Sequence, residues 1–87
     1  MADHIPVNGS VKRNIETPLT LTALQILVGG FIRFVELSSG DWMVINEASL
    51  EGTLEGTSFL NPTASQLAGK SGPIYGDAVI CDPKEIA

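Results

Sequence analysis

Short stretches with the two characteristic hydrophobic periods predict the first elements of this chain. Between Ser10 and Glu16 apolar and polar positions alternate, which is typical of a half-buried strand. Arg13 falls on the apolar side of this segment and therefore favours a place at the edge of a sheet. Leucine and valine then recur at helical spacing across Leu21–Val28, which predicts a helix. Gly29-Gly30 ends it, because glycine readily adopts the left-handed conformation that closes a helix.

The middle of the chain predicts a β-hairpin. Residues 31–37 and 42–46 are rich in β-branched and aromatic side chains, and a short polar turn with one glycine separates them. The hairpin is followed by residues 48–60, which have no clean hydrophobic period and contain two glycines. We expect a long loop there, with room for a short strand.

The C-terminal third predicts one more helix and one more strand. Asn61-Pro62 is a typical helix start, since asparagine caps the first turn and proline fits its first position. Gly69 ends this helix, and Ile74–Cys81 is the last strand. The element order predicts an α+β fold, with a small antiparallel or mixed sheet of about four strands and two short helices on one face. The 87 residues allow one domain, with a flexible N-terminal segment over residues 1–9.

Composition narrows the classes of partner. Ten acidic and five basic residues give a formal net charge of −5, which favours solubility. The acids are scattered, which argues against a DNA-mimicking surface, and five cations are too few for nucleic-acid binding. No stretch is long and apolar enough to span a membrane, and the N-terminus lacks a basic signal region, so we expect a cytoplasmic location. A core this small is marginal and favours a homo-oligomer.

The sequence offers little for catalysis. His4 is the only histidine and Cys81 the only cysteine, so neither a zinc site nor a nucleophile–base pair is expected. Cys81 lies in an apolar strand and should be a buried small residue. Pairs among Glu47, Glu51 and Glu55 could approach one another, but we expect solvated carboxylates there. The chain is therefore predicted to be no enzyme and to use no cofactor or metal.

A polar set begins at the end of the hairpin and reaches the second helix. Its residues suit either an anionic ligand at a helix N-terminus or ordinary turn and cap chemistry, and both interpretations stay open. Arg33 adds a cation that could pair with phosphate. The predicted ligand-binding residues are Arg33, Asn46, Glu47, Thr57 and Asn61.

Several motifs together resemble a small uncharacterised family found in phages, plasmids and their hosts, catalogued only as a domain of unknown function. The matching segments are Leu24-Gln25, Val28–Ile32, Val44–Glu47, Asn61–Ala64 and Ile74–Ile80. Two departures stand out: Arg33 replaces an acid, and Ala48-Ser49 replaces a Glu-Gly pair. The resemblance implies a phage-type accessory protein and no particular reaction.

Two functions of different classes follow from these expectations. The first is counter-defence by sequestering a small anionic ligand such as a nucleotide immune signal. The second is inhibition of a host defence protein through an acidic surface, with Trp42 as an anchor, since tryptophan is enriched in interface hot spots. Trp42 also suits core packing, because the chain contains few other large side chains.

Overall fold

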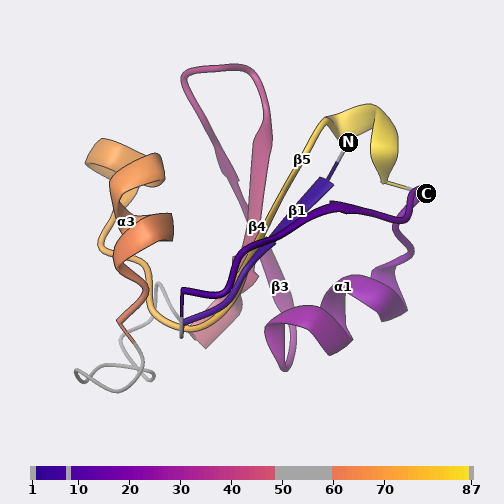
Figure 1. The fold of residues 1–87 in the computed structure, drawn as a ribbon, viewed down its shortest axis with the longest axis horizontal. Coiled ribbons are helices and arrows are strands. Elements are labelled where there is room, and N and C mark those ends of the chain that lie inside the picture. The colour runs from indigo at the N-terminus through magenta and orange to yellow at the C-terminus, as the bar shows by residue number, and fades with distance from the viewer. Residues whose placement is uncertain (1, 8, 49–59, 87) are drawn as a thin grey trace.

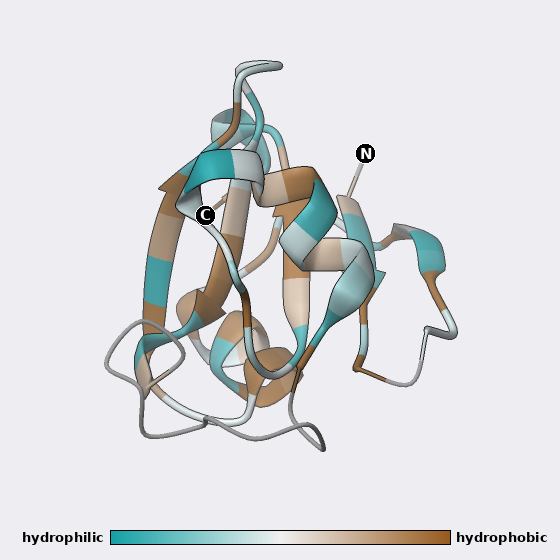
Figure 2. Ribbon diagram, turned by 90° about the vertical axis from the view of Figure 1, so that its left-hand side faces the viewer, coloured by the Kyte–Doolittle hydropathy of each residue, from teal (hydrophilic) through white to brown (hydrophobic). Residues whose placement is uncertain are grey.

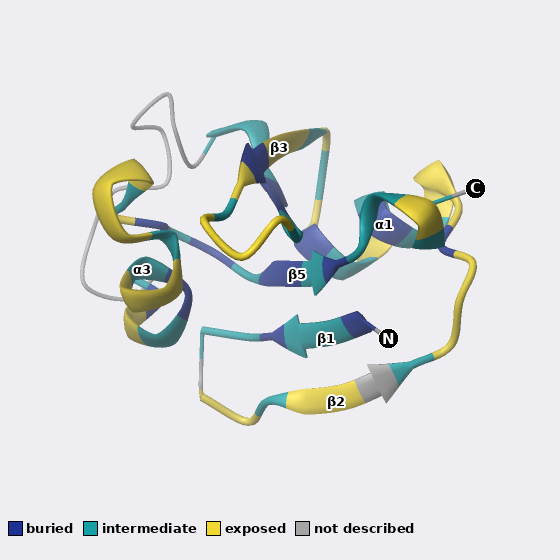
Figure 3. Ribbon diagram, turned by 90° about the horizontal axis from the view of Figure 1, so that it is seen from above, coloured by how far each residue is buried: buried dark blue, intermediate teal, exposed yellow. Residues whose placement is uncertain are grey.

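The computed structural model describes residues 2–7, 9–48 and 60–86 and has an antiparallel five-stranded sheet at its centre (Figure 1). The sheet order is β2-β1-β5-β4-β3, so that β2 and β3 form its two edges (Figure 3). This confirms the α+β class with an antiparallel sheet. The strands are β1 (Ala2–Ile5), β2 (Lys12–Ile15), β3 (Ile32–Glu36), β4 (Trp42–Asn46) and β5 (Ala78–Cys81).

The N-terminal strand β1 corrects the sequence interpretation. The prediction of a flexible segment over residues 1–9 is wrong for Ala2–Ile5, which pairs with β2 on one side and β5 on the other. Ala2 and Ile5 are buried on opposite faces of the sheet. Two apolar residues three positions apart lack the alternation of a half-buried strand, so only the neighbouring strands reveal this element.

Within the described residues, α1 (Leu21–Val28) and α3 (Pro62–Ala68) accompany the sheet. Thr20 caps α1 by accepting a hydrogen bond from the Ala23 N–H, and Gly29 closes it with φ of 80°. The predicted bounds of α1 are thus confirmed, as is the helix start at Asn61. Short 3₁₀ turns follow α3 at Gly69–Ser71 and β5 at Pro83–Glu85.

The helices lie against opposite faces of the sheet, whereas the sequence predicted one shared face. Along β4, Val44 packs in a cluster with Leu24 and Val28 of α1. Its neighbours Met43 and Ile45 pack in a second cluster that includes Ala64 of α3. Successive side chains of a strand point to opposite faces, so this alternation assigns α1 and α3 to different sides, and Figure 1 shows them on opposite sides of the hairpin.

Both faces of β4 and β5 are therefore buried, which gives these strands continuous apolar runs in place of alternation. Met43, Val44 and Ile45 are all fully buried, as are Ala78 and Val79. Figure 2 shows apolar residues dominating the central strands, while the helices carry both apolar and hydrophilic segments. A small sheet covered on two sides has two thin cores, each closed by one short helix.

Candidate functional site

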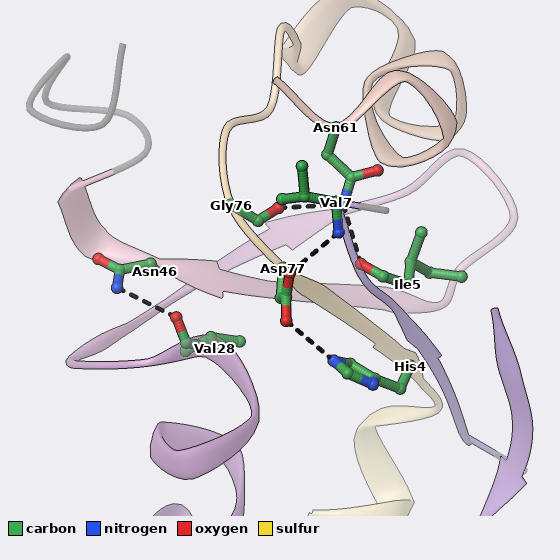
Figure 4. A network of polar contacts seen from close by, with 8 residues as sticks. All are labelled: His4, Ile5, Val7, Val28, Asn46, Asn61, Gly76 and Asp77. Carbon is green, nitrogen blue, oxygen red and sulfur yellow. Dashed lines mark hydrogen bonds and ion pairs between the residues drawn. The ribbon is translucent and has the colours of Figure 1, made fainter. Parts of the chain in front are cut away.

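Asn61 lies at the N-terminus of α3 and is fully buried. Its side-chain oxygen accepts a hydrogen bond from the Ala64 N–H at 3.0 Å. Both hydrogens of its amide are used as well, on the carbonyls of Ile5 at 2.8 Å and Gly76 at 3.0 Å (Figure 4). Asn61 thus ties α3 to β1 and to the segment before β5. Its side chain has no donor left for a ligand, which gives this predicted site residue a structural role.

Asn46 ends β4 and is half-buried. Its amide nitrogen donates to the Val28 carbonyl at 3.1 Å, at the C-terminal end of α1 (Figure 4). Its oxygen accepts a hydrogen bond from the Ala48 N–H at 2.9 Å. A Cβ on Gly30 would lie only 3.0 Å from the same amide nitrogen, so glycine permits this approach. Asn46 therefore positions the end of β4 beside the end of α1.

Arg33 and Glu47 do come together. The Arg33 guanidinium lies 3.7 Å from the Glu47 carboxylate, and the two side chains are 47% and 42% exposed. An ion pair this long and this exposed contributes little to stability and leaves guanidinium donors facing solvent. Among the predicted site residues that the structure describes, Arg33 is consequently the most accessible to a ligand.

Phe31 completes this corner, and the sequence interpretation did not include it in the site. Its carbonyl accepts a hydrogen bond from the Glu47 N–H at 2.8 Å, which extends the hairpin ladder by one pair. By strand alternation Phe31, Arg33 and Glu47 share one sheet face. Phe31 is 73% exposed, so its ring is available for contact from solvent. The hydrophobic pattern of the sequence does not indicate that this ring is exposed.

We call Phe31, Arg33 and Glu47 the hairpin corner. It offers a guanidinium for an anion, an aromatic face for stacking and a carboxylate that can accept hydrogen bonds. Asn46 precedes Glu47 and directs its amide to the Val28 carbonyl, and Asn61 belongs to another part of the fold. Thr57 lies outside the described residues.

A second polar pair was not expected from the sequence. The His4 Nε2 atom lies 3.4 Å from one carboxylate oxygen of Asp77, and the other oxygen accepts a hydrogen bond from the Val7 N–H at 3.0 Å (Figure 4). These residues are 73 positions apart, and only the pairing of β1 with β5 joins them. These contacts link the N-terminal strand to the residues just before β5, which suits a structural role.

Cys81 is buried, as expected for a small apolar-strand residue. Burial raises the pKa of its thiol to about 11, and the charges of Glu85, Asp41 and Asp82 act in the same direction. The thiolate is the reactive form of cysteine, so this environment makes Cys81 a poor nucleophile. Among the described residues, no three His, Cys, Asp or Glu side chains are grouped as metal ligands.

Comparison of the chain with protein-family models, curated proteins and solved structures found no match. The family resemblance accordingly rests on the motifs alone. In the part of the chain that the structure describes, every helix falls short of the length and apolarity needed to cross a bilayer.

Proposed function

We propose that this chain is a non-enzymatic binding protein that captures a small anionic ligand of the nucleotide type at the hairpin corner. The supporting observation is the exposed Phe31 ring on the same sheet face as the half-exposed Arg33. A nucleotide presents a phosphate and a flat base, and these match a guanidinium and an aromatic face. Together with the motif resemblance, this favours a phage-type accessory protein that sequesters a nucleotide signal in the host cytoplasm.

Calorimetric titration of linear and cyclic nucleotides into the parent protein tests the proposal. Arg33→Ala should weaken binding about tenfold or more, since a charge-assisted hydrogen bond contributes about 1.5–3 kcal/mol. Phe31→Ala should weaken nucleotide binding by about 1–3 kcal/mol through lost stacking, and it should leave the affinity for inorganic phosphate unchanged.

Lys84→Ala is the matched control, because it also removes one exposed cation. Lys84 lies at the other end of the hairpin from the corner. It comes three residues after Cys81, which pairs with Trp42 at the start of β4, whereas Glu47 follows the end of β4. The Lys84→Ala variant should bind nucleotides with the same affinity as the parent protein. Absence of nucleotide binding by the parent would overturn the proposal.

The second candidate is inhibition of a host protein, and the aromatic pair of Phe34 and Trp42 favours it. Their ring centroids lie 5.0 Å apart on the α1 side of the hairpin, and Phe34 is 44% exposed. Exposed aromatic side chains are typical anchors of protein interfaces. This candidate takes precedence if the parent binds a host protein while no nucleotide competes for it.

A further inference from the structure

One edge of the sheet has the geometry of an open pairing surface. The Glu47 N–H donates to the Phe31 carbonyl and the Leu37 N–H to the Asp41 carbonyl, which fixes the phase of the β3–β4 ladder. In an antiparallel ladder, hydrogen-bonded and non-bonded residues alternate. The backbone groups of Ile32, Phe34 and Glu36 therefore point away from β4. In the described part of the chain no strand lies beyond them (Figure 3).

The opposite edge, β2, differs in the features that limit pairing. It is four residues long, and its register with β1 shifts between Ala2 and His4. Its two charges, Lys12 and Arg13, are both positive, whereas β3 carries one charge of each sign. Lysine, short length and irregular register are devices that protect sheet edges from association. The β3 edge has five regular pairs with β4 and carries the exposed Phe34 at its centre.

We propose that β3 pairs with β3 of a second copy of this chain, antiparallel and centred on Phe34. In this register Phe34 lies opposite its own copy on a two-fold axis, and Ile32 lies opposite Glu36. All three outward-pointing residues of each strand then exchange backbone hydrogen bonds. The two five-stranded sheets become one continuous sheet, and the Phe34–Trp42 pairs of both copies lie on one face.

Like-charge repulsion disfavours one of the two neighbouring registers. A shift of one strand by two residues in one direction places Arg33 directly opposite Arg33 of the second copy. Like charges directly opposite each other are destabilising. A shift in the other direction places Phe34 opposite Glu36. The register centred on Phe34 sets Arg33 opposite Val35 of the second copy.

The contact is small, which sets the expected strength. Five residues of β3 are far fewer than the roughly 20–30 residues a side of a standard interface. We therefore expect a reversible dimer whose population depends on protein concentration. The pairing does not depend on the proposed nucleotide, whose binding can be titrated separately on a monomeric variant.

Sedimentation of the full chain over a range of concentrations tests the dimer. Phe34→Lys opposes two lysines on the axis and should weaken dimerisation at least about tenfold. Ile26→Lys is the control, because Ile26 is an exposed apolar residue on α1 and is 75% exposed. It should dimerise like the parent. A parent that stays monomeric at millimolar concentration, or equal weakening by both variants, would overturn the proposal.

Cysteine cross-linking tests the register directly. In the proposed pair the two Cα atoms of residue 34 lie about 5.5 Å apart, within the range of a disulfide. Oxidation of Phe34→Cys should therefore give a covalent dimer. Glu36→Cys should not cross-link, since its two copies lie roughly 13 Å apart along the strands. The buried Cys81 does not compete. Cross-linking of Glu36→Cys as efficient as that of Phe34→Cys would refute this register.

Discussion

Asn61 and Asn46 carry the same amide, and both were expected from the sequence to contact a ligand, yet their surroundings give them different roles. Asn61 is fully buried and joins three segments through its side chain. Asn46 is half-buried and joins the ends of β4 and α1 beside the exposed hairpin corner. The comparison teaches that burial decides whether polar chemistry serves folding or remains available at the surface.

The largest effect is expected at Asn61. Asn61→Ala removes the α3 cap and leaves the buried carbonyls of Ile5 and Gly76 without their donor. We expect a loss of about 3 kcal/mol in the free energy of unfolding, measured by chemical denaturation. Asn61→Ser keeps a capping oxygen and should recover only about 1 kcal/mol of that loss. Full recovery by serine would show that the amide donors contribute nothing.

A smaller effect is expected at Asn46. Asn46→Ala loses the contact with the Val28 carbonyl, but water can reach a half-buried group, so the cost should be about 1 kcal/mol. Gly30→Ala provides the sharper measurement, because its Cβ would crowd the Asn46 amide. Gly30→Ala should lower the free energy of unfolding of the parent protein, and it should lower that of the Asn46→Ala variant by less. A double-mutant cycle without coupling would contradict this contact.

The smallest stability change is expected at the hairpin corner. Glu47→Gln removes an exposed ion pair, so the free energy of unfolding should change by less than about 0.5 kcal/mol. If the corner binds an anion as proposed, the same substitution should raise the affinity by releasing Arg33. Calorimetric titration measures the change in affinity, and chemical denaturation measures the change in the free energy of unfolding. A large stability loss without a change in affinity would place Glu47 with the structural residues.

Local signals were sufficient for much of the fold. The α1 helix, the Asn61-Pro62 helix start and the β3–β4 hairpin were predicted because each depends on residues close in sequence. Of the residues predicted to bind a ligand, Arg33 and Glu47 lie close together across the hairpin. The sequence could not show that the Asn61 side chain is buried and fully hydrogen-bonded, because the residues of a helix start are the same whether that end is buried or exposed.

By itself the sequence determined the α+β class and the local elements, since caps, glycines and hydrophobic periods act within a few residues. The tertiary structure decided the rest. It placed Ala2–Ile5 between β2 and β5, separated α1 and α3 onto opposite faces, and paired His4 with Asp77. The tertiary structure also decided that the Asn61 amide is buried and that the Phe31 ring is exposed. Each depends on backbone partners far away along the chain, and no short-range pattern encodes them.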